Sequence, residues 1–392
     1  METYIIHNAR AVTAMGITLC DLLIDEGRIV DIKPGLKADC PVFDVHNALL
    51  FPGFVDVHTH GCRGIDVNHA SAEDYLTLAK EYASFGVTSF LPTILSDAPD
   101  RTLTLLHEAF RAAREASPGA RILGIHLEGP FLSPAYKGAM PPQFLRLPER
   151  RLFDAYYDAS GGLLRRITLA PELKDSCALI SHAVQRKVSV SLGHSGASYE
   201  EAMAAIKAGA SSCTHTFNGM SLFHQHRPGI MGAVLESDIY CEAICDGLHL
   251  HPGAIRLLLK TKGYGRVTAV TDSIMAAGMP DGKYRLGVND VVVTNGDALL
   301  ADGSSRAGST LTMLGAFRKL LSFTGCGLPE ASRLLSGNPA ALLGEDDTIG
   351  SIAPGKNADF LLLDDSLTLL GTYVAGQCIY RPTAVFRERR NA

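Results

Sequence analysis

The chain has 392 residues, of which 46% are hydrophobic and none is tryptophan, and its formal net charge at pH 7 is −5. This charge gives no basic surface for nucleic acid or an anionic membrane, and no apolar run approaches the roughly 18 residues that a membrane-spanning helix requires. The first residues lack the basic and apolar segments of a secretion signal, so we expect a cytoplasmic protein.

Along the chain, residues 3 to about 50 alternate short apolar runs with turns and predict β-strands, with a hairpin at Asp25-Glu26-Gly27. From residue 51 onward, strand-like runs alternate with helical patterns, which indicates a parallel α/β sheet. The clearest helical patterns cover residues 72–85, 100–115, 199–208 and 255–259. After Asn338-Pro339-Ala340, turns followed by apolar runs return. We therefore expect a (β/α)8 TIM-like barrel at 51–349, inserted in a small β-sandwich domain formed by 1–50 and 350–392.

Six polar residues come at or just after the ends of apolar runs, in the order His58, His60, Glu128, His194, His215 and Asp272. The first two close the string F-P-G-F-V-D-V-H-T-H, and residues two apart in a strand point to the same side. A parallel barrel gathers the carboxyl ends of its strands around one mouth, where such folds keep their chemistry. One strand-end histidine alone is more often structural. Six such residues, all at the carboxyl ends of predicted strands, indicate a site for one or two divalent ions, with Zn²⁺ or Fe²⁺ favoured.

The other titratable groups are expected to be structural. We interpret five histidines as surface or core residues: His46, His69, His107, His126 and His182. The role of His126, two residues before Glu128, stays open. The nine cysteines include no C-x-x-C pair and are expected to be reduced thiols. Among them, Cys62 is expected to lie near the barrel mouth.

The order H-x-H, carboxylate, two separate histidines and a final aspartate resembles the amidohydrolase superfamily, and G-S-I-A-P-G-K-N-A-D is typical of the return to its β domain. Within that superfamily, H-L-E-G-P-F-L-S-P-A-Y-K-G-A, S-L-G-H-S-G-A, T-H-T-F-N-G-M and A-V-T-D-S resemble the N-acetylglucosamine-6-phosphate deacetylases over essentially the whole chain. The resemblance implies a homodimer that removes acetate from an amino-sugar phosphate in amino-sugar catabolism, with a divalent metal as cofactor.

Residue by residue, the resemblance implies that Glu128, His194 and His215 are shared metal ligands. His58 and His60 match a second metal position that only some members have, with Glu128 able to bridge the two ions. Asp272 matches the catalytic acid/base, although it could also be a ligand, or serve as both. The substrate-binding residues implied by the resemblance are Ala139, Met140, Asn218, Gly219, His226, Arg227, His249, Arg306, Ala307 and Gly308.

Three departures from the family pattern lie on the substrate side. Met140 stands where many members have a histidine, and a thioether cannot donate a hydrogen bond. The usual R-E-P-G reads H-Q-H-R-P-G, so His226 aligns with the phosphate-reading arginine and Arg227 lies one place later. Arg306 stands where an apolar residue is common. Deacetylation is therefore a firmer expectation than recognition of the phosphate.

Other functions are compatible with parts of this pattern. The nearest is a deacetylase for N-acetylgalactosamine 6-phosphate or for an unphosphorylated amino sugar. A non-catalytic sugar sensor would be expected to have lost a ligand or the acid, whereas all six residues are present. Cyclic-amide hydrolases such as dihydroorotase usually bridge their metals with a modified lysine, where this chain offers Glu128.

Overall fold

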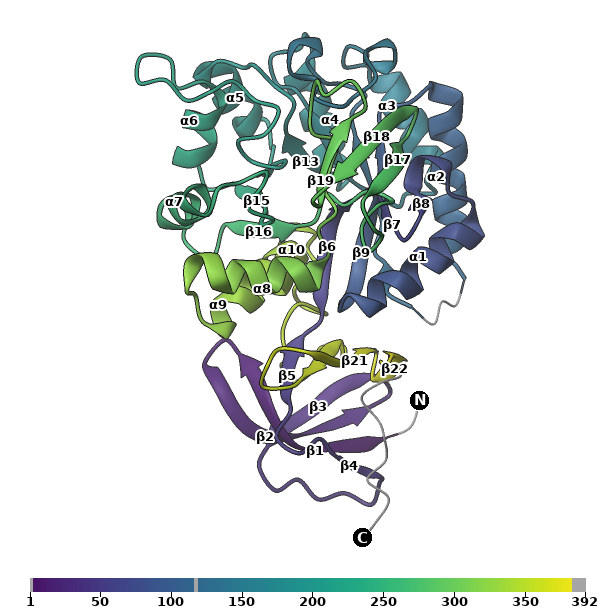
Figure 1. Cartoon of the computed structure of the whole chain (residues 1–392), viewed down its shortest axis with the longest axis vertical. Helices are drawn as coiled ribbons and strands as arrows, with labels where there is room; N and C mark the ends of the chain where they lie inside the picture. Colours follow the sequence, from purple (N-terminus) through teal and green to yellow (C-terminus); the bar gives the residue numbers. More distant parts are fainter. Residues whose placement is uncertain (1–2, 116–118, 383–392) are drawn as a thin grey trace.

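The structure, a computed structural model, describes residues 3–115 and 119–382. It consists of a barrel of parallel strands surrounded by helices and a separate small β-sheet (Figure 1). The predicted fold class, a (β/α)8 TIM-like barrel inserted in a small β domain built from both ends of the chain, is confirmed, and the strands of the small domain are joined in one hydrogen-bonded sheet.

The barrel contains eight parallel strands that follow one another in chain order. They are β6 (Phe54–Thr59), β9 (Val87–Leu95), β11 (Ile125–Glu128), β12 (Leu164–Leu169), β13 (Ser189–Leu192), β14 (Ser212–Cys213), β15 (Tyr240–Ile244) and β16 (Val267–Val270), with β10 (Arg121–Ile122) added beside β9. A parallel bridge between Thr59 and Ser273 joins the first strand to the segment after the last. This bridge closes the barrel and brings the end of β6 beside the end of β16.

Helices connect consecutive barrel strands and cover the outside of the barrel (Figure 1). The connecting helices are α1 (Ala72–Ser84), α2 (Pro99–Ala113), α3 (Arg150–Ala159), α4 (Ser176–Gln185), α5 (Tyr199–Lys207), α6 (Gly229–Glu236) and α7 (Pro252–Lys262). After the last barrel strand follow α8 (Met313–Thr324), α9 (Leu328–Ser332) and α10 (Asn338–Leu342). Capping boxes, Ser71 with Asp74 and Ser198 with Glu201, fix the starts of α1 and α5. The four helical patterns expected from the sequence therefore correspond to α1, α2, α5 and α7.

The small sheet has the strand order β22-β21-β20-β5-β1-β2-β3, with β4 paired to β1. Its strands are β1 (Tyr4–Thr13), β2 (Gly16–Asp25), β3 (Arg28–Lys33), β4 (Val42–Asp44), β5 (Leu49–Pro52), β20 (Phe360–Leu363), β21 (Leu369–Val374) and β22 (Gln377–Tyr380). The predicted hairpin is confirmed: Glu26 and Gly27 have φ of 47° and 79°, as a two-residue type I′ turn requires. The chain passes from this sheet into the barrel between Pro52 and Phe54. The exact domain limits stay a prediction, and residues 383–392 lie outside the described residues.

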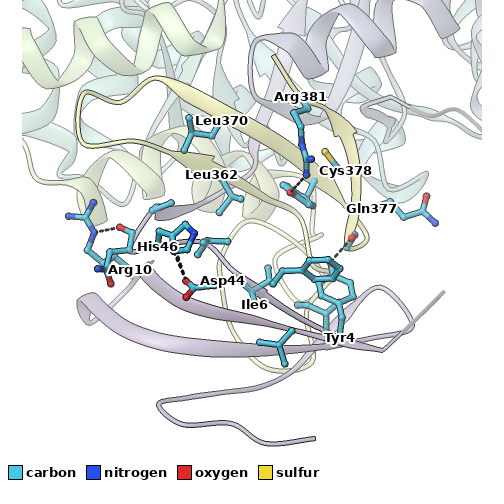
Figure 2. Close-up of a pocket in the computed structure, with 18 of the residues that line it drawn as sticks. Tyr4, Ile6, Arg10, Asp44, His46, Leu362, Leu370, Gln377, Cys378 and Arg381 are labelled. Carbon is cyan, nitrogen blue, oxygen red and sulfur yellow. Dashed lines mark hydrogen bonds and ion pairs between the residues drawn. The ribbon is translucent and has the colours of Figure 1, made fainter. Parts of the chain in front are cut away.

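The small sheet encloses a cavity of about 1040 Å³ (Figure 2). Apolar side chains such as Ile6, Leu362 and Leu370 line it, and the Arg10–Asp365 ion pair lies at one end. Its lining comes from the two chain ends rather than from the barrel. This cavity is therefore separate from the cluster of polar residues at the barrel mouth.

A three-stranded antiparallel sheet, β17 (Gly282–Leu286), β18 (Asn289–Thr294) and β19 (Asp297–Leu300), follows the last barrel strand and was not expected from the sequence. A short hairpin, β7 (Gly61–Cys62) with β8 (Ile65–Asp66), follows the first barrel strand. The inserted sheet buries Leu286 and Val291 in an apolar cluster with Leu95, Leu132 and Met140. The insertion thus forms part of the wall around the barrel mouth.

Candidate active site

The six predicted residues converge at the carboxyl ends of the barrel strands. Glu128 is the last residue of β11, and His194, His215 and Asp272 each come two residues after a strand end. These three have positive φ, of 48°, 28° and 49°, a conformation that is uncommon for residues other than glycine and that concentrates at functional sites. The backbone therefore turns sharply where each side chain must face the barrel axis.

Glu128, His194 and His215 form one group of possible metal ligands. Oε1 of Glu128 lies 3.2 Å from Nε2 of His194 and 3.0 Å from Nε2 of His215. The two histidine Nε2 atoms are only 3.0 Å apart. All three side chains are at least nine-tenths buried.

His58, His60 and Asp272 form a second group beside the first. Nε2 of His60 lies 3.1 Å from Oδ1 of Asp272 and 3.2 Å from Oε2 of Glu128. Nε2 of His58 lies 3.4 Å and 3.5 Å from the same two oxygens. Each oxygen of Glu128 therefore faces one histidine pair, which is the arrangement that a carboxylate bridging two ions requires.

The other ring nitrogen of each histidine faces an oxygen that can only accept a hydrogen bond. The Nδ1 atoms of His60, His194 and His215 lie 2.9–3.1 Å from main-chain carbonyl oxygens, and Nδ1 of His58 lies 2.9 Å from a carboxylate oxygen of Glu242. Each Nδ1 must therefore carry a proton, which leaves the lone pair of each neutral ring on Nε2. Four lone pairs directed at two carboxylates fit the donor set of a divalent metal centre.

The electric field of the cluster favours positive charge. Burial alone would lower the pKa of His60, but hydrogen bonds to Asp272 and Glu128 outweigh burial and raise this pKa to about 9. Burial alone would raise the pKa of Glu128, but His58, His194 and His215 hold it well below its usual range. Without metal, this raised pKa keeps His60 protonated at neutral pH beside two ionised carboxylates, Glu128 and Asp272. A divalent cation can displace that proton and take its place between the carboxylates, so the site is suited to one.

Five of the six residues line a cavity of about 200 Å³, and His58 lies fully buried behind them. Seven of the ten predicted substrate residues line it: Ala139, Met140, Asn218, Gly219, His249, Arg306 and Gly308. Four further lining residues, Leu95, Gly138, Leu286 and Ser305, were not predicted. Leu286 comes from the unexpected inserted sheet, so no local pattern in the sequence could have assigned it to the site.

Three predicted substrate residues lie elsewhere. His226 and Arg227 are on an exposed loop and do not line this cavity in the described part of the chain. Ala307 is fully buried in the apolar cluster beneath the inserted sheet. Arg306 does reach the cavity, but its guanidinium makes a two-pronged ion pair with Asp297, at 2.9 and 2.8 Å. Its charge is thus partly satisfied within the chain.

Cys62 and His126, two further residues considered in the sequence, both lie in the core. Cys62, two residues after His60, is fully buried in the core and does not line the cavity at the mouth. His126 is a core residue, with its ring nitrogens 3.1 and 2.8 Å from the hydroxyls of Thr93 and Thr168. Burial lowers the pKa of His126 well below its usual value, so the ring is neutral.

In the described residues all nine cysteines are free thiols, and no helix is long and apolar enough to cross a bilayer.

Comparison with known proteins agrees with this geometry. The sequence pattern of the amidohydrolase family matches residues 49–388. N-acetylglucosamine-6-phosphate deacetylase from Danio rerio is 38% identical over 378 residues, covering 92% of this chain and 93% of that protein. N-acetylgalactosamine-6-phosphate deacetylase from Escherichia coli O157:H7 is 36% identical and covers 96% and 99%.

Among solved structures, a mutant of N-acetyl-D-glucosamine-6-phosphate deacetylase from Mycobacterium smegmatis in complex with N-acetyl-D-glucosamine-6-phosphate superposes with a TM-score of 0.91. It is 32% identical, and the match covers 97% of this chain and 100% of that one. The family match spans most of the chain, and relatives above 30% identity cover nearly all of it. The chain therefore belongs to the amidohydrolase family.

Proposed function

We propose that the protein is a metal-dependent deacetylase that hydrolyses N-acetylglucosamine 6-phosphate to glucosamine 6-phosphate and acetate. The amide C–N bond breaks, the oxygen of water joins the acetyl carbon, and its protons are shared between the products. The observation that carries the proposal is the position of Glu128 between two histidine pairs at the edge of a small cavity. The relatives that match over nearly the whole chain support the same reaction.

One divalent ion, with zinc or iron favoured, would be held by Glu128, His194 and His215. A second would be held by His58 and His60, with Glu128 bridging and Asp272 nearby. When bound, such an ion lowers the pKa of a bound water from 15.7 to about 7 and polarises the amide carbonyl. The protein contributes fixed imidazole tautomers, a buried site and a carboxylate within reach of both groups.

Asp272 is the proposed acid/base. Its carboxylate takes a proton from the attacking water and delivers it to the leaving nitrogen, because an amine leaves readily only when it is protonated. Its main-chain N–H donates to the carbonyl of His58, and its own carbonyl accepts from the N–H of Ser309. These bonds from both sides hold the turn that places the carboxylate at the mouth.

The cavity favours a small substrate, because its 200 Å³ lies below the roughly 300–1,000 Å³ of sites for drug-sized ligands. His249 lines the cavity and is fixed by Asp246, whose Oδ2 lies 2.6 Å from Nδ1 of His249. We assign His249 and Asn218 to the sugar hydroxyls, and Ala139, Met140, Gly219 and Gly308 to the surrounding walls. The phosphate is proposed to bind Arg227 together with His226, and Arg306. The proposed assembly is a homodimer.

The test is acetate release by the purified protein with N-acetylglucosamine 6-phosphate, N-acetylgalactosamine 6-phosphate and N-acetylglucosamine compared side by side. We expect the highest kcat/KM for the first. The galactosamine phosphate is the second candidate, because a relative with that activity in its name is 36% identical to this chain. Absence of acetate release from all three, with metal bound, would overturn the proposed reaction.

A further inference from the structure

A buried glutamate lies directly behind the metal-ligand cluster. Glu242, from β15, is completely inaccessible to solvent and faces the barrel interior. Its Oε2 lies 2.9 Å from Nδ1 of His58 and accepts the main-chain N–H of His215 at 2.8 Å. One carboxylate oxygen therefore contacts a member of each group of candidate ligands.

The contact distinguishes His58 from the other three histidines of the site. The Nδ1 atoms of His60, His194 and His215 face neutral carbonyl oxygens, whereas Nδ1 of His58 faces a carboxylate. A charged acceptor fixes the tautomer more strongly and makes the opposite nitrogen a better electron donor. That opposite nitrogen, Nε2, is the one directed at Glu128 and Asp272.

Arg166, also fully buried, holds this carboxylate in place. Its Nη2 lies 2.6 Å from Oε1 of Glu242 and donates to the hydroxyls of Ser191 and Ser212, on β13 and β14. Its Nε and Nη1 have no hydrogen-bond partner in the described residues, although they are buried. A buried ion pair that leaves two guanidinium nitrogens without acceptors is a poor source of stability.

We propose that Glu242, held by Arg166, is a positioning residue. Its carboxylate holds the His58 ring so that Nε2 points toward the second metal position. The same carboxylate oxygen accepts the main-chain N–H of His215 and so also fixes the backbone turn at that ligand. This inference rests on the proposed metal-dependent function, because it concerns the ion that His58 and His60 would hold.

The test is calorimetric titration of chelator-treated, full-length protein with Co²⁺. The variants are Glu242→Gln, which keeps an accepting oxygen, and the double variant Glu242→Met/Arg166→Met, which removes the anchor without leaving an unpaired buried charge. His58→Asn/His60→Asn serves as the reference for loss of the second position. The matched control is Asp359→Asn, because Asp359 is a buried carboxylate just before β20 that pairs at 2.9 Å with Arg121 of β10, outside the metal-ligand cluster.

We expect the double variant to bind the His58-dependent Co²⁺ about 10- to 100-fold more weakly, the usual effect of removing a partner behind a metal ligand. Glu242→Gln should fall between it and the wild type, and Asp359→Asn should match the wild type. Wild-type Co²⁺ affinity in a folded double variant would overturn the role of Glu242 while leaving the proposed function intact. A wild-type protein that binds no Co²⁺ would overturn both.

Discussion

Oδ1 of Asp272 lies 3.1 Å from Nε2 of His60, between the end of the last barrel strand and the end of the first. This position lets one carboxylate exchange a proton with a group held at the metal cluster. We expect Asp272→Asn to lower kcat by about two to four orders of magnitude, the range for loss of a positioned acid/base, with little change in metal content.

The control for that variant is Asp290→Asn, since the Asp290 side chain is 76% exposed on the inserted sheet. It should keep wild-type turnover. An Asp272→Asn protein that retained more than a tenth of wild-type kcat would show that another group moves the proton.

The second metal position depends on His58 and His60. Replacing both with asparagine removes both histidines of that group, while Glu128, His194 and His215 keep the other group complete. We expect metal content, measured by mass spectrometry of protein purified without added metal, to fall toward one ion per chain. His46→Asn, which alters an exposed histidine, is the control and should leave the content unchanged.

The same double variant also tests the alternative that the pair is structural. If two ions per chain were recovered from it, His58 and His60 would not be ligands.

Stability should depend on pH in opposite ways with and without metal. In the metal-free protein the pKa of His60 rises from 6.5 to about 9 on folding, because the bonds to Asp272 and Glu128 outweigh burial. A raised pKa stabilises the folded state fully below pH 6.5, and this stabilisation is lost as the pH rises through 9. We therefore expect the Tm of chelator-treated protein to fall between pH 6.5 and 9.5.

In the metal-loaded protein, protons compete with the ion for the imidazoles, so stabilisation by metal increases with pH. Thermal unfolding across the same pH range with and without Zn²⁺ checks both trends. Metal-free His60→Asn should show a shallower fall, and an equally steep fall in that variant would assign the effect to other groups.

The elements that the sequence predicts well are those determined by neighbours in the chain. The capping residues Ser71 and Ser198 start their helices where expected, and the Glu26-Gly27 turn requires two positive φ values that its residues tolerate. The strand-end positions of His194 and Asp272 follow from the apolar runs before them. A parallel barrel then brings these ends together without further information from the sequence.

The features that the sequence did not predict depend on pairs distant in the chain. Glu242 lies in an apolar run that indicates only a buried strand, and its partners Arg166 and His58 come from two other strands. The ion pair of Arg306 with Asp297 depends on the register of β19, which belongs to the unexpected inserted sheet. The pairing of these charges is a property of the closed barrel and the insertion, so composition and periodicity alone did not reveal it.

The two arginines proposed to bind the phosphate have different surroundings. Arg227 lies on an exposed loop with His226, and Arg306 lines the cavity but is paired with Asp297. A phosphate dianion held by charge-assisted hydrogen bonds should raise kcat/KM well above that for the unphosphorylated sugar. We expect a preference of more than about tenfold for N-acetylglucosamine 6-phosphate over N-acetylglucosamine, equivalent to ~1.4 kcal/mol. A smaller preference would mean that the protein does not recognise the phosphate.

Single variants then separate the two arginines. Arg227→Ala should reduce the preference mainly through KM, because the contact is made equally in the ground and transition states. Asp297→Asn releases Arg306 from its ion pair and should increase the preference if that guanidinium also reaches the phosphate. If Arg227→Ala leaves a large preference unchanged while Arg306→Ala removes it, Arg306 is the reader. If neither variant changes it, the reading residue comes from a neighbouring subunit, and the preference should then fall as the protein is diluted below its dissociation constant.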